Sequence, residues 1–313
     1  MKRIKVGLII GLLLSALVIT GCGAINSTTN SLGTGSASDT DHKLTVYTSV
    51  YPMYDFTQKI AGDKIILKNL VPAGTEPHEW EPTPSDIADL EKADVLIYNG
   101  AGMEPWLDKV LNSINPEKLK TVEASKEVKL LNNTDGAKNK GTDPHVWLDP
   151  MSAKVEMGAI KDALVSIDPA NKDYYEKNYE DNAAQLDQLD QEYKSAVAQF
   201  SKKDIVVAHQ AFSYLCNAYG LNQVAIEGIS ADSEPSPARM AEIVEFAREK
   251  QLKYIFFEEL VSPKVAQTIA QETGAATAVL NPFEGSTDSG QQAGKDYFSV
   301  MRDNLKVLKQ ALQ

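Results

Sequence analysis

The sequence has 313 residues, 43% of them hydrophobic and 24% charged, which is enough for one large globular domain or two of ordinary size. Its 43 acidic residues outnumber its 31 lysines and arginines, and the net charge of −12 argues against a nucleic-acid-binding protein, which needs a basic face. With only two cysteines, the chain also lacks the disulfide framework that stabilises many small secreted domains.

The first residues have the pattern of an export signal: three basic residues precede the apolar stretch 6–19. This stretch ends in VITGC at residues 18–22, which resembles the lipobox of bacterial lipoproteins. We therefore expect residues 1–21 to be a lipoprotein signal peptide and Cys22 to carry the lipid, whose two or more acyl chains suffice for stable attachment. A transmembrane helix is the alternative, but the run is shorter than the about 20 apolar residues that span a bilayer.

Residues 22–41 are almost wholly small and polar, a composition with nothing to bury, and we expect a disordered tether. A flexible chain of this length would hold the folded body on average about 25 Å from the membrane. Cleavage of the signal would leave 28 lysines and arginines against 43 acidic residues, a net charge of −15. We therefore expect an acidic protein on the extracytoplasmic face of the cell membrane, held there by its lipid rather than by direct adhesion to anionic lipids.

Apolar, β-branched runs of strand length alternate with helical patterns along the rest of the chain. The expected strands are residues 44–49, 65–71, 94–98, 204–208, 223–227, 254–258 and 276–280. Strands separated by helices predict βαβ units and mostly parallel sheets, and therefore an α/β fold.

Five helix starts are marked by a proline after a capping residue, because proline suits the first helical position and Ser, Thr or Asp suits the cap. They are Thr83-Pro84, Asp149-Pro150, Asp168-Pro169, Ser236-Pro237 and Ser262-Pro263. The helix predicted from Asp168 meets no Gly or Pro between residues 170 and 200. Its length of about 45 to 50 Å exceeds what one small sheet needs. We interpret it as a rigid connector, with a short coiled coil as the alternative.

The expected organisation is thus two pseudo-symmetric α/β lobes, each a mostly parallel sheet with flanking helices, joined by one long helix. The N-terminal lobe would cover residues 42–168, the connecting helix 169–200 and the C-terminal lobe 201–313. We expect the protein to be a monomer.

Two of the four histidines lie in copies of one phrase, Pro-His-x-Trp, at residues 77–80 and 144–147. His78 and His145 each lie in a loop before a capped helix, and His209 directly follows the predicted strand 204–208. In open α/β sheets ligands bind at the carboxyl ends of strands. Because imidazole is the commonest protein ligand for zinc and a site needs three or four ligands from separate segments, these histidines predict a metal site.

A fourth ligand would complete a tetrahedron. Glu284, just past the last predicted strand, is the candidate, and Asp288 is the alternative. Trp80 and Trp147 would form an apolar wall around the metal, or would serve as anchors of the hydrophobic core. The short motif of zinc proteases, H-E-x-x-H, is not met here, because Pro82 stands where the second histidine would be.

Six phrases, taken together, resemble a known family. They are TEPHEWEPTPSD (75–86), DPHVWLDP (143–150), AHQAFSYLCNAYGL (208–221), GISADSEPSPARMAEI (228–243), FFEELVSPK (256–264) and LNPFEG (280–285). In this order they are similar to the metal-binding subgroup of substrate-binding lipoproteins that serve bacterial ABC importers. The resemblance covers residues 43–313 and implies two α/β lobes joined by a long rigid helix, with the metal in the cleft between them. Carried over by position, the family's metal ligands are His78, His145, His209 and Glu284.

The resemblance also bears on the choice of metal. Manganese-binding members place a carboxylate where this chain has His209, whereas three imidazoles and one carboxylate suit Zn²⁺. Zinc-binding members often carry a histidine-rich loop between the first two ligands, but residues 131–143 contain no histidine. This departure argues against accessory metal capture by the loop and leaves the core site unaffected.

We therefore expect a protein that is not an enzyme, that binds Zn²⁺ between its lobes and that delivers it to the permease of an ABC importer. Three alternatives stay open: a manganese-binding member of the family, a zinc-dependent hydrolase, and a surface adhesin with a structural zinc. Copper is a chemical competitor, because affinities for divalent ions rise toward Cu²⁺.

Overall fold

The computed structural model describes residues 43–313 apart from the segments 116–117, 133–140, 230–234, 288–289 and 291–293. The predicted signal peptide, Cys22 and the tether lie outside the described residues. Within the described part of the chain, no helix has both the length and the apolar character needed to cross a membrane.

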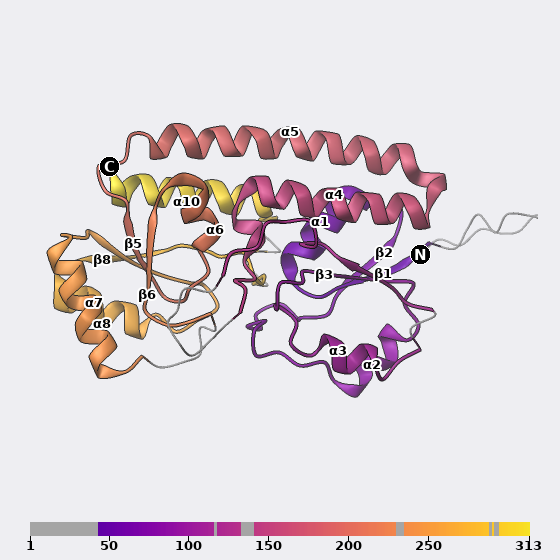
Figure 1. The fold of residues 1–313 in the computed structure, drawn as a ribbon, viewed down its shortest axis with the longest axis horizontal. Helices are drawn as coiled ribbons and strands as arrows, with labels where there is room; N and C mark the ends of the chain where they lie inside the picture. The colour runs from indigo at the N-terminus through magenta and orange to yellow at the C-terminus, as the bar shows by residue number, and fades with distance from the viewer. Residues whose placement is uncertain (1–42, 116–117, 133–140, 230–234, 288–289, 291–293) are drawn as a thin grey trace, which may run out of the picture. The chain divides into compact units, whose positions relative to one another are not determined.

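The N-terminal lobe contains a four-stranded parallel sheet with the strand order β2-β1-β3-β4 (Figure 1). Its strands are β1 (Thr45–Thr48), β2 (Ile66–Asn69), β3 (Val95–Tyr98) and β4 (Lys120–Glu123). The helices of this lobe are α1 (Tyr51–Ala61), α2 (Pro84–Leu90), α3 (Leu107–Leu111) and α4 (Pro150–Ile167). The three strands predicted here are confirmed, whereas β4 was missed. Its sequence KTVE lies at the sheet edge without a fully buried residue, so it lacks the apolar run by which the other strands were recognised.

The C-terminal lobe contains two parallel strand pairs, β5 with β6 and β7 with β8. Its strands are β5 (Asp204–Val207), β6 (Asn222–Ala225), β7 (Tyr254–Phe257) and β8 (Ala276–Val279). Its helices are α6 (Ser213–Tyr219), α7 (Pro237–Glu249), α8 (Lys264–Thr273) and α10 (Tyr297–Leu312). All four strands predicted in this half are confirmed to within two residues, and the predicted α/β fold with parallel sheets in both lobes is confirmed.

Three of the five proline-marked helix starts are confirmed by their caps. Thr83 forms a capping box with Asp86, and the Asp149 carboxylate accepts hydrogen bonds from the backbone N–H groups of Met151 and Ser152. Ser236 likewise caps α7.

The other two helices begin later than predicted, although Asp168-Pro169 does open a short 3₁₀ helix. Asp168 ends α4 as its C-cap and is followed by a single 3₁₀ turn, Pro169–Asn171, so that the long helix begins only at Lys172. Its carboxylate accepts a hydrogen bond from the Tyr175 hydroxyl (2.6 Å) and makes no backbone cap. Helix α8 begins after Pro263, which itself occupies the cap position that had been predicted for Ser262.

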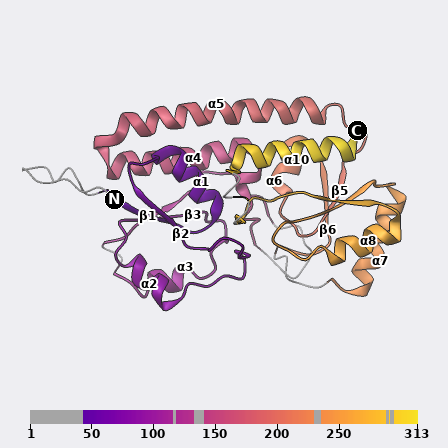
Figure 2. The same ribbon diagram turned by 180° about the vertical axis from the view of Figure 1, so that it is seen from behind.

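Helix α5 (Lys172–Val197) extends along both lobes (Figures 1 and 2). It packs against α1 and α4 of the N-terminal lobe and against α6 and α10 of the C-terminal lobe. Near its start, the Asn178 amide donates a hydrogen bond to the Ile60 carbonyl (2.9 Å), and near its end the Tyr193 hydroxyl donates to the Met301 carbonyl (2.6 Å). One helix is therefore fixed to both lobes, as predicted, although the boundaries at residues 168 and 200 remain predictions.

A single buried apolar cluster continues from one lobe into the other. It includes Phe56 and Trp147 of the N-terminal lobe and Phe212 and Tyr297 of the C-terminal lobe. The rings of Phe56 and Tyr297 are 5.1 Å apart, and the Tyr297 hydroxyl donates a hydrogen bond to the Trp147 carbonyl (2.6 Å). Wide separation of the lobes would expose this surface, at a cost of about 25 cal/mol for each Å² of apolar area.

Within this scaffold, Glu156 of α4 is fully buried and neither of its carboxylate oxygens has a hydrogen-bond partner. Burial, reinforced by the negative charge of Glu104, raises the pKa of this carboxyl well above its ordinary value of 4.5. The folded state therefore keeps a proton that the unfolded chain loses above that value, so this group lowers the stability as the pH rises.

We predict that Glu156→Met raises the free energy of unfolding at pH 8 by about 1 to 3 kcal/mol, because it removes an unpaired buried polar group. The gain should shrink toward pH 5, where the unfolded chain keeps more of its protons. Urea unfolding at several pH values would measure both effects, with Glu180→Met on the exposed face of α5 as the control. A Glu156→Met protein that is less stable than wild type at pH 8 would contradict the prediction.

Candidate metal centre

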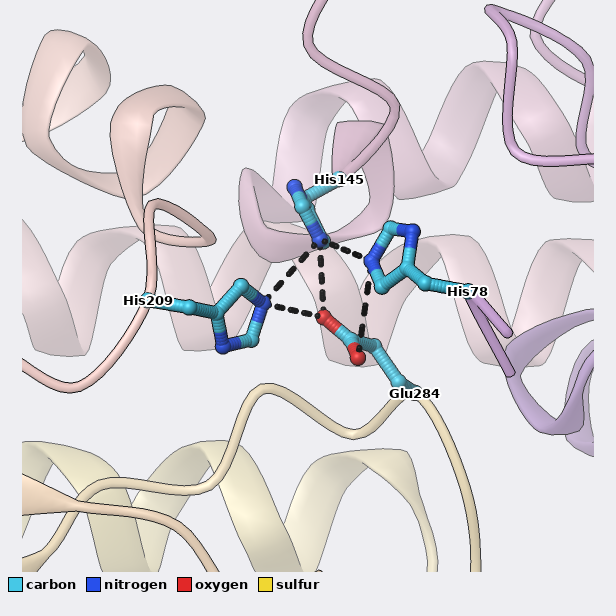
Figure 3. Close-up of side chains that lie close together, drawn as sticks. All are labelled: His78, His145, His209 and Glu284. Atoms are coloured by element: carbon cyan, nitrogen blue, oxygen red, sulfur yellow. Dashed lines mark hydrogen bonds and ion pairs between the residues drawn. The ribbon is translucent and has the colours of Figure 1, made fainter. Parts of the chain in front are cut away.

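Four predicted site residues meet at one point (Figure 3). His78, His145, His209 and Glu284 each offer one ligand atom, and these four atoms all lie within 4.8 Å of one another. His145 Nε2 is 3.1 Å from His78 Nε2, 3.4 Å from His209 Nε2 and 2.8 Å from Glu284 Oε1. Ligands held at about 2 Å from one tetrahedral ion would be about 3.3 Å apart. The three distances from His145 Nε2 bracket this value, and all four atoms are close enough to bind one ion.

The four residues come from loops of both lobes. His78 lies between β2 and α2, and His145 immediately precedes the 3₁₀ turn Val146–Leu148 that leads into α4. His209 and Glu284 follow β5 and β8, respectively. Loops beyond the carboxyl ends of parallel strands are the usual place for ligand binding in α/β folds. Each lobe thus contributes two of the four side chains.

The centre is shielded from solvent. The side chains of His145 and His209 are fully buried, Glu284 is 4% exposed and His78 is 8% exposed. A buried carboxylate is costly unless positive charge or hydrogen bonds compensate it. The imidazoles of His145 and His209 can supply positive charge to Glu284, and so could a bound cation.

Two further carboxylates orient the buried imidazoles. The Nδ1 atom of His145 lies 2.8 Å from Asp143 Oδ1, and that of His209 lies 2.7 Å from Glu258 Oε1. An imidazole that donates its Nδ1–H to a carboxylate keeps the Nε2 lone pair for a metal, and the bond also fixes the ring orientation. Sequence reasoning did not identify these two residues. Asp143 stands two residues before His145, and Glu258 stands directly after a strand, so their positions were the available signals.

The charges of the centre shift its pKa values in opposite directions. Burial lowers the pKa of His145, but the negative charges of Glu284 and Asp143 outweigh it and raise this pKa to about 9. Burial also acts on His209, where Glu258 and Glu284 outweigh it and raise the pKa well above its usual range. For His78 burial dominates, so its pKa is lowered.

The carboxyl of Glu284 responds to the same contacts. Burial would raise its pKa, but the adjacent His209 and His145 outweigh burial and hold the pKa well below its ordinary value. These shifts favour a charged Glu284 beside protonated His145 and His209 in the metal-free protein. A metal ion must displace their protons before it can take their nitrogen lone pairs.

The two tryptophans differ in their relation to the centre. Trp147 is fully buried, and its ring lies 5.6 Å from that of His145. The Trp80 ring packs against the Trp106 ring in the core of the N-terminal lobe, with 5.5 Å between the ring centres. A role as a wall of the metal site stays a prediction for both residues. Asp288, the alternative ligand, lies outside the described residues.

A small acidic cavity lies beside the centre. Its lining includes the carboxylates of Glu76, Glu258, Glu259 and Glu284. Its volume of about 20 Å³ is room for a single water molecule. An acidic lining of this kind attracts cations toward the four converging side chains.

Comparison with known proteins identifies the family. The family model described as "Zinc-uptake complex component A periplasmic", ZnuA, matches residues 46–311. The "High-affinity zinc uptake system protein ZnuA" of Bacillus subtilis is 41% identical over 306 residues, which cover 95% of this chain and 94% of that protein. The "Zinc-binding lipoprotein AdcA" of Streptococcus pneumoniae is 41% identical over 280 residues, 86% of this chain. This chain spans only 56% of the length of AdcA.

A solved structure shows the same fold. The crystal structure of the Zn(II)-bound ZnuA-like domain of Streptococcus pneumoniae AdcA superposes with a TM-score of 0.77 at 41% sequence identity. The match covers 87% of this chain and 99% of that domain. The chain described here therefore belongs to the ZnuA family, the component A proteins of zinc-uptake complexes.

Proposed function

We propose that this protein captures Zn²⁺ outside the cytoplasm and delivers it to the membrane permease of an ABC importer. One observation carries the proposal: three imidazole nitrogens and one carboxylate oxygen from four separate loops lie within 4.8 Å of one another. The names of its relatives, a high-affinity zinc uptake protein and a zinc-binding lipoprotein, support zinc as the cargo. His78, His145, His209 and Glu284 are the proposed ligands.

The donor set favours zinc over manganese. Imidazole nitrogen suits Zn²⁺, whereas Mn²⁺ prefers sites richer in oxygen, and only Glu284 supplies oxygen in this set. Glu284 would also neutralise one of the two positive charges of the ion inside a buried site. Asp143 and Glu258 would hold two of the imidazoles in the tautomer that presents Nε2 to the metal.

The arrangement favours transport over hydrolysis. A catalytic zinc keeps an open coordination position for water or substrate, whereas four protein ligands close the tetrahedron. The proposed lipid at Cys22 would keep the protein at the membrane beside its permease. A single such centre in a monomer is sufficient for delivery of one ion at a time.

Growth under zinc limitation tests this function. A strain that lacks the gene should grow poorly in medium depleted of zinc by a chelator, and added zinc should restore growth. The wild-type gene should also restore growth, whereas a His145→Ala variant of equal abundance should not. Full growth of the deletion strain would favour the adhesin alternative. Zinc-dependent esterase activity that is lost in Glu284→Ala would favour the hydrolase.

A further inference from the structure

Glu284 belongs to the C-terminal half of the chain, but its backbone is attached to the N-terminal lobe. We define the Glu284 segment as residues 281–287, between β8 and α10. The Trp147 indole N–H donates a hydrogen bond to the Pro282 carbonyl (2.7 Å), and the Tyr51 backbone N–H donates to the Glu284 carbonyl (3.4 Å). The Gly74 backbone N–H donates to the Ser286 carbonyl (2.7 Å). All three donors belong to the N-terminal lobe.

Phe283, immediately before Glu284, has an unusual backbone conformation. Its φ angle of +59° lies in the left-handed region, which bulky side chains rarely adopt. Such a conformation costs on the order of 1 to 3 kcal/mol and persists only where the surrounding structure imposes it. Phe283 is therefore held in this conformation by its contacts.

The contacts that hold Phe283 come mainly from aromatic rings. Its side chain is 2% exposed and lies 5.1 Å from the Tyr51 ring and 5.6 Å from the Tyr297 ring. Its backbone N–H donates a hydrogen bond to the Asn281 side chain (2.7 Å). The Tyr297 ring is itself fixed by the hydrogen bond from its hydroxyl to the Trp147 carbonyl. Both lobes thus enclose the Phe283 ring.

The conformation at Phe283 determines the direction in which Glu284 points. Rotation of φ at residue 283 to the usual negative range would swing the following residue through more than a right angle. With φ as it is, Glu284 Oε1 lies 2.8 Å from His145 Nε2 and 3.0 Å from His209 Nε2 (Figure 3). A metal site needs its ligands within a few tenths of an ångström of the productive geometry.

We propose that Phe283 is a positioning residue for the metal centre: its ring, packed between Tyr51 and Tyr297, stabilises the left-handed backbone that directs Glu284 at the imidazoles. The inference rests on the proposed function, because it requires Glu284 to be a metal ligand. It goes beyond that function, because it assigns the positioning of the Glu284 carboxylate to Phe283, which is not itself a metal ligand.

A double-mutant cycle separates positioning from a general contribution to the fold. Zinc affinity is measured by competition with chromophoric chelators in the wild type, Phe283→Ala, Glu284→Ala and the double variant. We expect Phe283→Ala to lower the affinity at least tenfold in the wild type and less than twofold in the Glu284→Ala background. Residues that act through one another are non-additive in this way, whereas independent residues give equal losses in both backgrounds.

Two further variants provide the controls. Phe298→Ala removes a comparably buried ring that also packs on Tyr297 (5.7 Å) but makes none of the three bonds to the Glu284 segment. It should lower the unfolding midpoint in urea and change zinc affinity less than twofold. Trp147→Phe keeps an aromatic ring, although a smaller one, and removes the donor to Pro282, so it serves as the test if Phe283→Ala does not fold. It should weaken zinc binding severalfold, and only when Glu284 is present.

The outcomes are distinguishable. Wild-type affinity in both Phe283→Ala and Trp147→Phe would overturn the positioning role and leave the proposed function intact. An equal loss from Phe283→Ala with and without Glu284 would also overturn it. A wild-type protein that binds no zinc would overturn the proposed function and, with it, the reason to assign a positioning role.

Discussion

Replacement of His209 by alanine is expected to lower zinc affinity at least 100-fold and to leave the purified protein without stoichiometric zinc. The variant loses one of four donor atoms and also leaves Glu258 and Glu284, both 4% exposed, without the imidazole that lies between them. Loss of an outer carboxylate partner alone typically costs about 10- to 100-fold in metal affinity, and loss of a ligand should cost more. A 100-fold loss corresponds to about 2.7 kcal/mol.

Elemental analysis of the purified wild type and variant, combined with chelator competition, measures this loss. Thermal unfolding of both metal-free proteins serves as the check that His209→Ala still folds. A companion variant, His209→Asp, supplies a carboxylate oxygen in place of the imidazole nitrogen. The ratio of its zinc affinity to its manganese affinity should therefore be smaller than that of the wild type. Stoichiometric zinc retained by His209→Ala would remove His209 from the centre and weaken the choice of zinc over manganese.

Zinc affinity is also expected to fall by about 100-fold for each unit of pH between pH 8 and pH 6, because the ion competes with two protons. The pKa of His145 in the metal-free protein is about 9, and that of His209 is raised well above its usual range. Both imidazoles are therefore protonated across this interval. Burial lowers the pKa of His78, so this imidazole contributes less to the effect than the other two.

Calorimetry in buffers of different ionisation enthalpy counts these protons directly. At pH 7, about two protons should be released for each zinc bound. Glu258→Gln removes one of the charges that raise the pKa of His209. The number of protons released per zinc should therefore fall toward one, and zinc affinity should depend less steeply on pH. Equal affinity at pH 6 and pH 8, or binding without proton release, would contradict histidine ligation.

The parts of the fold that could be predicted are those with a local signal. Buried parallel strands need apolar, β-branched runs, so seven of the eight strands among the described residues could be predicted from the sequence. The exception, β4, is an edge strand that buries little, and its residues were therefore indistinguishable from a loop. The pattern Asp168-Pro169 opens the 3₁₀ turn Pro169–Asn171, and α5 follows it at Lys172. A cap followed by proline marks the start of a helical turn but does not show whether that turn is 3₁₀ or α.

The candidate site could be predicted in part, because some of its residues also have a local signal in the sequence. Three histidines in strand-to-helix loops or directly after a predicted strand could be assigned together, because ligands of α/β folds bind beyond the carboxyl ends of parallel strands. The carboxylate partners Asp143 and Glu258 were not identified, since an acidic residue in a loop is usually solvated and only the fold shows that these two are buried. The left-handed backbone of Phe283 could not be predicted at all. It depends on packing against the rings of Tyr297 and of Tyr51, the second of which is more than 200 positions away in the sequence, and has no local sequence signal.

The paired charges of the metal-free centre have a consequence for transport. Two imidazolium protons carry the same charge as one Zn²⁺, so release of both protons on loading would make it an electroneutral exchange and would leave the net charge of the buried centre unchanged. The long-range field of the molecule is then similar with and without cargo, and a permease would have to distinguish the two forms by shape. Unloading would run the exchange in reverse, with two protons drawn from the surrounding medium for every ion that passes to the membrane.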